Sequence, residues 1–520
     1  MYVWSKPASF QVFKHTQMWK EDSPSLILHT GRRMMVSGQV CLRDTDKAFD
    51  ITGVEVTDLP EGVTVETYYA DYIVYNDGVP YPDIVSNKET AHVAMNTTQS
   101  IWLCFQIGDD AAVTTHTITI KIKTTLEDRT IRWKLTVYPV SLPDAKDSSF
   151  GHEYFLNTFG GFYGDRYWEN PPFEPYYHHL RYDEGWWDYM SNYAKTLKKM
   201  RVNSLHVPVM ILLVDGGSKR VSDTEWHLEF GLFDRFVEHF LSVGSFRYIT
   251  MCAIVDAVDG KAIQAIDENG SWTRFDIFTP EADAWAKAFY GGIYEHCKEK
   301  GWLPMLQMRL QDEPHASKYW KWAKDKCREY MPGVVCGEPL DMHTISRELC
   351  GYVDQYIPRL EVYEEGADFY LERQRAGEQV WCYSCCYPFE MGWMNKFIDL
   401  PPIYSRLIKW VCFTHGITGF LHWGFNCWDG MLYGMHPDAR FKGDGFIVYP
   451  DVEHNSLLLS ARGINTIEGL QDWELLNILS KTNATAARAI CRRVAAAFND
   501  LHADAYELEA ARVEVLTLLS

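Results

Sequence analysis

The sequence predicts an α/β protein in which an N-terminal antiparallel β-sandwich domain precedes a (β/α)8 barrel of the TIM type. Before residue 145, short stretches alternate apolar and polar residues, as in 63–67 and 117–122, and Gly, Pro, Asn and Asp separate them. This pattern is typical of antiparallel strands. After residue 145, short apolar runs alternate with stretches of helical period, which indicates parallel strands joined by crossover helices.

Three parts follow from this change of pattern. We expect a β-sandwich domain over 1–145, the barrel over 146–482, and C-terminal helices packed on the barrel over 483–520. The candidate barrel strands cover residues 152–157, 204–214, 248–255, 303–310, 334–336, 355–357, 380–386 and 419–425. The candidate helices cover residues 187–200, 233–243, 282–300, 317–330, 366–375 and 403–414. Eight strands with helices between them match the TIM barrel.

Composition excludes several classes of partner. The net charge of −20 argues against nucleic acid and anionic membrane surfaces, because both attract basic proteins. No apolar stretch is long enough to span a bilayer. The first residues lack a charged segment followed by an apolar run, so we expect no signal peptide and a cytoplasmic location. The 13 Cys, an odd number, favour reduced buried thiols over a disulfide framework. An acidic surface does not indicate an oligomeric state.

The segment Gln311-Asp312-Glu313-Pro314 ends the apolar run 302–310. Two adjacent carboxylates therefore fall where a buried strand breaks into a loop. Barrel enzymes carry their catalytic groups at the carboxyl ends of strands, so we predict that Asp312 and Glu313 are catalytic.

Polar and aromatic residues occur at the other predicted strand ends. Those that we expect to bind substrate are Tyr383, Trp423, Asn426, Trp428, Asn157, His206 and Glu338. An aromatic loop follows the first strand and contains Tyr163, Tyr167, Trp168, Tyr176 and Tyr177. Flat rings in a cleft stack on sugar faces, so the combination predicts a carbohydrate site. The alternative is a purely structural role, in which these rings fill the barrel mouth or pack beneath the sandwich.

The adjacency of the two carboxylates points to a particular mechanism. In ordinary retaining glycosidases the two carboxylates face each other across the anomeric carbon at about 5 Å, which sequence neighbours do not readily do. Side by side, they suit participation by the substrate's own 2-acetamido oxygen, which attacks C1 and forms an oxazolinium ion. Asp312 then orients the acetamido group, and Glu313 protonates the leaving oxygen and later deprotonates water. We expect a charged Asp312 to raise the pKa of Glu313.

Two further contacts complete this hypothesis. Tyr383 donates a hydrogen bond to the acetamido oxygen, and Trp423 or Trp428 forms the wall around the acetamido methyl group.

Arg462, Glu468 and Asp472 are instead expected to form structural salt bridges on the helix that closes the barrel.

Three motifs resemble those of one known family. They are the Gln-Asp-Glu-Pro run at 311–314, the segment 420–428 and the segment 460–474. The sequence is similar in these segments to glycoside hydrolase family 123, a family of β-N-acetylgalactosaminidases with a β-sandwich before a (β/α)8 barrel. The resemblance implies a retaining, substrate-assisted mechanism with Asp312 and Glu313 as the catalytic pair, and our leading hypothesis is an exo-acting enzyme. It also implies a substrate with a terminal β-linked N-acetylhexosamine on an oligosaccharide or glycoconjugate. We expect no cofactor.

Two other interpretations of single motifs are weaker. Cys382 and Cys385 have the spacing of a thioredoxin-like redox site, but they lie in a strand-like run and not at the start of a helix. No second Cys or His pair follows at a zinc-binding spacing, so we predict no metal.

Two other functions remain open from the residues alone. One is a glycosidase of the same fold for a sugar without a 2-acetamido group, which needs a nucleophile from another strand, such as Glu338. The other is a non-catalytic carbohydrate-binding protein. An intact Asp-Glu pair argues against the second, because a binding protein needs no general acid.

Overall fold

The computed structural model describes residues 1–75, 77–158, 174–428 and 441–520. The chain divides into two compact units. Unit 1 comprises Met1–Pro143, Phe389–Gly416 and Gly430–Ser520, and unit 2 comprises Asp144–Pro388 and Ile417–Asp429. In the described ranges, none of the helices is long and apolar enough to cross a membrane.

Unit 1 contains two five-stranded sheets. The first is antiparallel, in the order β1 (Tyr2–Pro7), β3 (Met34–Arg43), β8 (Thr98–Ile107), β5 (Val63–Val74) and β6 (Pro80–Ser86). The second has the order β2 (Ile27–Arg32), β10 (Arg129–Ser141), β9 (Thr115–Thr124), β4 (Phe49–Thr57) and β7 (Ala91–Val93). In it, β2 runs parallel to β10 and the remaining pairs are antiparallel.

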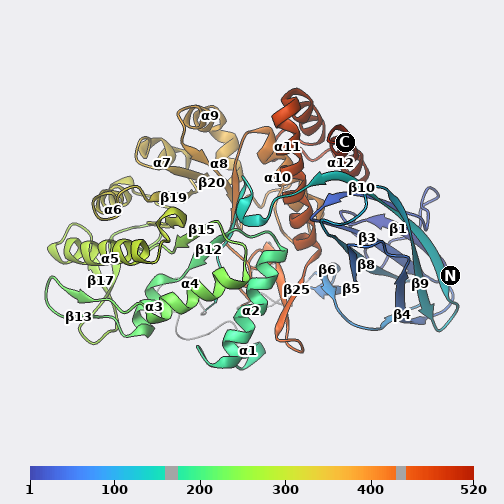
Figure 1. Cartoon of the computed structure of the whole chain (residues 1–520), viewed down its shortest axis with the longest axis horizontal. Coiled ribbons are helices and arrows are strands. Elements are labelled where there is room, and N and C mark those ends of the chain that lie inside the picture. Colours follow the sequence, from blue (N-terminus) through green and yellow to red (C-terminus); the bar gives the residue numbers. More distant parts are fainter. Residues whose placement is uncertain (76, 159–173, 429–440) are drawn as a thin grey trace. The chain divides into compact units, whose positions relative to one another are not determined.

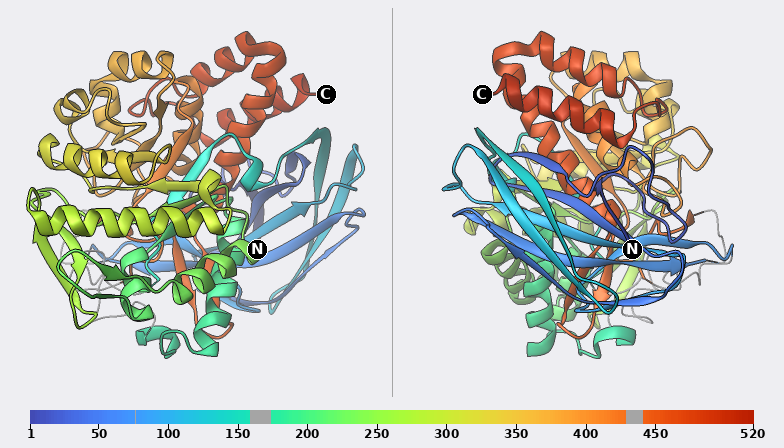
Figure 2. Two further views of the ribbon diagram at one scale, coloured as in Figure 1. Left: turned by 60° about the vertical axis from the view of Figure 1, so that its left-hand side comes forward. Right: turned by 90° about the vertical axis from the view of Figure 1, so that its right-hand side faces the viewer.

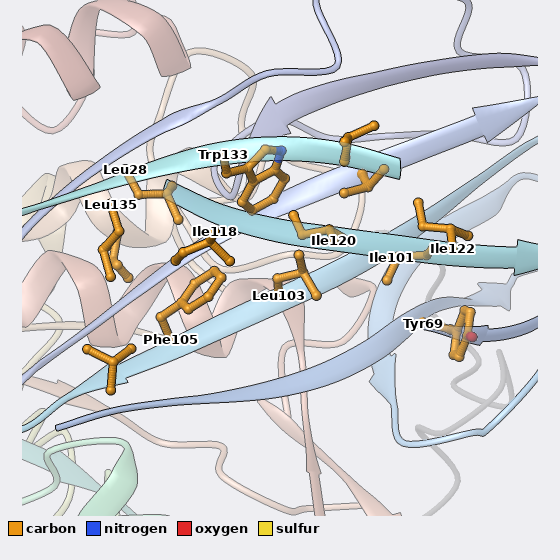
Figure 3. Close-up of a cluster of buried hydrophobic side chains, with 14 of the residues drawn as sticks. Leu28, Tyr69, Ile101, Leu103, Phe105, Ile118, Ile120, Ile122, Trp133 and Leu135 are labelled. Atoms are coloured by element: carbon orange, nitrogen blue, oxygen red, sulfur yellow. The ribbon is translucent and has the colours of Figure 1, made fainter. Parts of the chain in front are cut away.

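One hydrophobic cluster draws side chains from both sheets. In β9, alternate residues are buried and the residues between them are more exposed, as expected for a strand with one face in a core. Figure 3 shows Ile118 and Ile120 of β9 with Trp133 of β10, beside Leu103 and Phe105 of β8. The alternation in the sequence therefore predicts which face of these strands is buried.

Unit 1 also contains a helical part. It comprises α10 (Ile403–Thr414), α11 (Ala461–Val494), α12 (Ala505–Leu518) and the hairpin β24 (Val448–Asp451) with β25 (Ser456–Leu459). Helix α11 is interrupted at Asn483, whose φ of −145° and ψ of 69° are not helical. The predicted C-terminal helices thus begin near that kink, and the structure groups them in one unit with the N-terminal sheets.

Buried ion pairs connect elements of unit 1. Arg406 of α10 contacts Glu468 at 2.8 Å and Asp472 at 2.6 Å, both on α11. Arg462, at the start of α11, contacts Asp83 of β6 at 2.8 Å. The salt bridges that we predicted for Arg462, Glu468 and Asp472 are therefore confirmed.

Unit 2 contains one parallel sheet of nine strand segments. Their order is β21 (Gln379–Val380), β20 (Gln355–Pro358), β19 (Val335–Leu340), β18 (Leu306–Met308), β15 (Tyr248–Met251), β12 (Ser204–Val207), β11 (Gly151–Tyr154), β23 (Gly419–His422) and β22 (Cys382–Ser384). The two segments at the ends of this order, β21 and β22, are separated in the chain by Trp381 alone. The sheet therefore curls into a nearly closed barrel.

The helices of unit 2 connect these strands. They are α1 (Glu174–Tyr177), α2 (Glu184–Lys199), α3 (Val209–Gly216), α4 (Gly231–Val243), α5 (Pro280–Glu299), α6 (Ser317–Tyr330), α7 (His343–Glu348), α8 (Leu360–Glu365) and α9 (Ala367–Arg375). Figure 1 shows α4 to α9 following one another around the outside of the parallel strands, and Figure 2 shows the long α5 in front of them. Two short hairpins, β13 (Lys219–Arg220) with β14 (Trp226–His227) and β16 (Ala262–Ile266) with β17 (Trp272–Asp276), are inserted between these elements.

Two predicted strands include residues that form helical turns in the structure. The strand predicted over 204–214 ends at Val207, and Val209–Gly216 forms α3. Residues 209–213 are all apolar and buried, and a short run without periodicity does not distinguish a strand from a buried helix. The strand predicted over 303–310 begins with a 3₁₀ turn at Leu303–Met305, where Pro304 lacks the N–H that a strand would use.

Candidate active site

The two predicted catalytic carboxylates follow β18 in the central sheet of unit 2. After Gln311, which pairs with Val255 of the neighbouring segment, Asp312 and Glu313 form the loop that leads into α6. Both line a cavity of about 220 Å³. The other residues that line it are Phe155, Pro339, Tyr383, Cys385, Cys386, Leu421 and Trp423. These residues come from segments at the carboxyl ends of β11, β18, β19, β22 and β23, where a barrel carries its active site.

The backbone around the pair is strained and firmly held. Glu313 has a φ of +45° and Val258 a φ of +62°, both in the left-handed region that residues other than glycine seldom adopt. The N–H of Val258 donates to the carbonyl of Asp312 at 3.0 Å, and its carbonyl accepts from the N–H of His315 at 3.1 Å. The loop after β15 thus fixes the chain on both sides of Glu313. Strain maintained by its surroundings is typical of functional sites.

A buried carboxyl supports the same segment from β19. Oε2 of Glu338 accepts from the N–H of Leu310 at 2.9 Å, from the N–H of Gln311 at 3.3 Å and from Nε1 of Trp320 at 2.8 Å. Glu338 is fully buried, and burial raises its pKa well above the usual value. Its hydrogen bonds connect β19, α6 and the residues that precede Asp312 and Glu313. Glu338 was predicted to bind substrate, but the structure places it outside the set that lines the cavity.

Glu313 has the environment of a general acid. Burial is the main cause that raises its pKa, and the nearby Asp341 carboxylate raises it further. A hydrogen bond from Oη of Tyr383 to Oε1 of Glu313 opposes this rise, as do the charges of Arg359 and His315. We expected Asp312 to raise the pKa of Glu313, whereas burial and Asp341 are the leading causes in the structure. An acid with a raised pKa retains its proton closer to neutral pH.

The charged groups around Glu313 include residues that the sequence analysis missed. Asp341 directly follows β19 and lies 2.9 Å from Nε2 of His315. Arg359 directly follows β20, forms an ion pair with Glu361, and donates to the carbonyl of Asp341 at 3.5 Å. Both positions follow a parallel strand, so the rule that singled out Glu313 applies to them once the ends of β19 and β20 are known.

Tyr383 and Trp423, which we predicted to bind substrate, both line the cavity, and Tyr383 donates a hydrogen bond to Glu313. Both belong to a cluster with Phe155, Trp381 and Leu421. Trp423 is partly exposed, so its ring is available at the cavity surface. Whether these two residues contact a sugar stays a prediction.

Asn157 and Asn426 lie together but are buried. Oδ1 of Asn426 accepts from the N–H of Asn157 at 3.1 Å and from Oη of Tyr193 at 2.7 Å, and Nδ2 of Asn426 donates to the carbonyl of Asn157 at 3.0 Å. These bonds connect the ends of β11 and β23 to α2. In the structure both asparagines join strands and do not line the cavity.

The side chains of His206 and Trp428 are also packed against neighbouring side chains and do not line the cavity. The His206 ring stacks on Phe155 at 4.6 Å, and its Nε2 lies 3.0 Å from Sγ of Cys252. Burial lowers the pKa of His206 to about 3, so the ring is neutral. Trp428 is 1% exposed and packs against Tyr176 and Tyr177.

Part of the aromatic loop lies outside the described residues, namely Tyr163, Tyr167 and Trp168. Of its other members, Tyr177 is buried and its ring packs 4.4 Å from Tyr189. Within the described ranges, no group of three or more His, Cys, Asp or Glu side chains is placed to hold a metal ion.

A partly buried acid beside a second carboxylate, in a small cavity with a tryptophan at the strand ends of a nearly closed parallel barrel, is the arrangement of a glycoside hydrolase. The model of the glycoside hydrolase 123 catalytic domain matches residues 168–479, and the chain belongs to glycoside hydrolase family 123. The resemblance noted in the sequence is thereby confirmed.

A solved structure of the same family has the same fold. A family 123 glycoside hydrolase from Clostridium perfringens, studied for glycolipid glycan hydrolysis, is similar with a TM-score of 0.76 at 15% identity, over 99% of this chain and 97% of that one. A GH10 xylanase with a bacterial Ig-like domain from termite gut gives a TM-score of 0.36 at 9% identity, over 87% of this chain and 100% of that one. The second likeness is too small to bear on the chemistry. No curated protein sequence matches this chain.

Proposed function

We propose that this glycoside hydrolase is a retaining exo-β-N-acetylgalactosaminidase that uses the 2-acetamido group of its substrate as the nucleophile. The observation that carries the proposal is the position of the two carboxylates. Of the described residues that line the cavity, only Asp312 and Glu313 bear carboxylates, and they are neighbours on one loop. A pair on one loop suits action on two adjacent groups of the sugar better than action from opposite faces of C1.

The roles follow from the surroundings of each group. Glu313, whose pKa is raised, donates its proton to the glycosidic oxygen while the acetamido oxygen attacks C1 and the aglycone leaves. Asp312 stabilises the positive charge that develops on the acetamido nitrogen of the oxazolinium ion. Glu313, now a carboxylate, removes a proton from water as the water attacks C1. Two displacements at C1 give net retention of the β configuration.

Tyr383 has a different role from the one that we first expected. Because Oη of Tyr383 donates to Oε1 of Glu313, it positions the acid and leaves the other carboxyl oxygen to carry the proton. The acetamido methyl group then packs against the apolar wall that includes Phe155, Leu421 and Trp423.

The size of the cavity supports exo action. Its volume of about 220 Å³ is below the roughly 300–1,000 Å³ of pockets for drug-sized ligands, and suits a single terminal sugar. We assign this sugar as β-linked N-acetylgalactosamine at the end of an oligosaccharide or glycoconjugate. The work on the C. perfringens relative concerns glycolipid glycans, which makes a glycolipid the first natural substrate to examine.

We also propose a finer assignment of the fold. We treat β21 and β22 as one seventh strand, because Trp381 alone separates them and they pair with β20 and β23 respectively. The sheet is then an eight-stranded (β/α)8 barrel within 146–482, after a β-sandwich domain over 1–145. The helices over 483–520 complete the proposed organisation.

Hydrolysis of 4-nitrophenyl glycosides tests the proposal. The substrates are β-GalNAc, β-GlcNAc, β-galactoside and β-glucoside, and the proteins are wild type, Asp312→Asn and Glu313→Gln. We expect turnover of the 2-acetamido sugars alone, and a loss of about a hundredfold or more in either variant. Turnover of the β-galactoside at a similar rate, or unchanged activity in Glu313→Gln, would overturn it.

A glycosidase without acetamido participation is the weaker candidate. It needs a nucleophile from another strand, and Glu338 is the residue that we considered for this role. Glu338 is fully buried and bonded to Leu310, Gln311 and Trp320. This arrangement favours a supporting role.

A further inference from the structure

Two adjacent cysteines lie in the wall of the candidate active site. Cys385 and Cys386 begin the turn after β22, and both line the cavity that contains Asp312 and Glu313. Both thiols are partly exposed. Cys382, the other member of the motif with redox-site spacing, is fully buried within β22. The pair that shares a solvent-accessible wall is therefore Cys385 with Cys386.

The surroundings of Cys386 favour its reactive form. A hydrogen bond from the Cys385 thiol is the largest cause that lowers the pKa of Cys386, and the charge of Arg359 acts in the same direction. Burial and the Glu313 carboxylate oppose this decrease. In contrast, burial raises the pKa of the Cys412 and Cys491 thiols to about 12, which keeps them inert.

We propose that Cys385 and Cys386 form a modification site within the active site, in which hydroperoxides reversibly oxidise the vicinal dithiol and thereby block the sugar pocket. The site rests on the lining of one cavity by two thiols that are neighbours in the chain. The block of catalysis rests on the proposed function, whereas the oxidation itself does not.

The reaction has two steps. The Cys386 thiolate attacks a peroxide oxygen, so that an S–O bond forms, the O–O bond breaks, and the alcohol or water that leaves takes up a proton. The Cys385 sulfur then attacks the sulfenic sulfur, an S–S bond forms, the S–O bond breaks, and water leaves with the Cys385 proton. The dithiol loses two electrons and the peroxide gains them. A dithiol reductant reverses the modification.

Oxidation affects catalysis because the thiols border the acid. Tyr383, two residues before Cys385, donates to Glu313, and the N–H of Cys385 donates to the carbonyl of Tyr387 at 3.2 Å. The ring of Tyr387 lies 4.7 Å beneath the guanidinium of Arg359. Joining the two sulfurs rearranges this turn, which both changes the pocket wall and displaces the residues that position Glu313.

Mass spectrometry tests the oxidation without reference to activity. The folded full-length protein is treated with hydrogen peroxide, denatured, alkylated with iodoacetamide and digested. We expect Cys382 to be alkylated, and Cys385 and Cys386 to be protected in a peptide that has lost two hydrogen atoms. Cys385→Ser should stop at a sulfenic acid that dimedone traps on Cys386. Alkylation of both residues after peroxide, or a bond from either to Cys382, would overturn the proposal.

Inactivation kinetics test the consequence. Both thiols border the pocket, so the substitutions can change the hydrolysis rate by themselves. The rate of each variant after peroxide is therefore compared with the rate of the same variant before treatment. We expect Cys386→Ser to lose activity to peroxide at least about tenfold more slowly than wild type, and dithiothreitol to restore wild type. Cys350→Ser removes an exposed thiol that does not line the cavity, and should behave as wild type. If Cys385 and Cys386 are protected from alkylation but the activity is undiminished, the proposed block of catalysis is refuted and the oxidation is not. If the protein cleaves none of the glycosides but forms the Cys385–Cys386 disulfide, the proposed function is refuted and the oxidation is not.

Discussion

Tyr383 and Glu313 are joined by a hydrogen bond from the phenol to one carboxyl oxygen, across the small cavity at the strand ends of unit 2. Glu313 is held from the other side by its own strained backbone and by the loop around Val258. The acid is therefore positioned by its side chain and its main chain together. In the proposed mechanism, this arrangement sets both the orientation of the Glu313 proton and the pH range in which the acid acts.

Tyr383→Phe should raise the pKa of Glu313. The phenol donates to the carboxyl and stabilises its charged form, so its removal adds to the rise that burial already causes. Because the acid works protonated, the alkaline limb of the kcat/KM profile should shift to higher pH. The maximal rate should fall about tenfold to a hundredfold because the acid is less well oriented. A pH–rate profile of both proteins checks this, and an alkaline limb that moves to lower pH contradicts it.

Asp341→Asn should shift the alkaline limb of the kcat/KM profile to lower pH. The Asp341 carboxylate raises the pKa of Glu313, so its neutralisation lowers that pKa and the activity decreases at a lower pH. The variant also removes the ion partner of His315. Glu348→Gln is the matched control, because it neutralises a carboxylate at the end of α7 that bonds Ser317. A shift of the alkaline limb in Glu348→Gln as large as that in Asp341→Asn would contradict this prediction.

The sequence predicted the pair Asp312 and Glu313, which lines the cavity, but not all of its electrostatic partners. The predicted strand over 334–336 ended early, because Gly337, Glu338 and Pro339 interrupt its apolar run, whereas β19 continues to Leu340. Asp341 therefore did not appear to follow a strand. The raised pKa of Glu313 was predicted, but its main cause, burial, depends on tertiary contacts that no local pattern contains.

Glu338 offers a test of how the loop that carries Asp312 and Glu313 is supported. Glu338→Ala leaves the N–H groups of Leu310 and Gln311 and the indole of Trp320 without their acceptor. We expect it to lower the free energy of unfolding by about 2–5 kcal/mol. Glu338→Gln retains an acceptor oxygen in place of a carboxyl whose pKa is strongly raised, and should cost about 1 kcal/mol or less. Urea unfolding measures both, and equal losses in the two variants would contradict the assigned role.

Glu468 should make stability depend on pH. Burial is the main cause that raises its pKa to about 7, against the opposing charge of Arg406. The folded protein thus holds this proton more tightly than the unfolded chain, so the contribution is complete below about pH 4.5 and is lost as pH rises through 7. The loss is on the order of 1–3 kcal/mol. Urea unfolding at pH 5 and pH 8 should show a smaller decrease in Glu468→Gln than in wild type, and parallel decreases would refute the assignment.

Side-chain direction was the part of the site that the sequence could not supply. Asn157, Asn426 and Glu338 were placed at strand ends by pattern, and each is buried in contacts that join neighbouring elements. A shift of one residue in a short strand turns a side chain to the other face, and apolar patterning does not fix the last residues of a strand. In contrast, α6 and α10 match the predicted ranges, because their apolar residues follow the helical period over several turns.

The central claim is that the acetamido oxygen of the substrate is the nucleophile. Its most direct test is kcat/KM for 4-nitrophenyl β-GalNAc beside analogues whose N-acetyl group carries one, two or three fluorine atoms. Fluorine withdraws electrons from the amide oxygen, so we predict a steep, stepwise decrease in rate across the series. A flat series would contradict participation and would require a nucleophile from the protein.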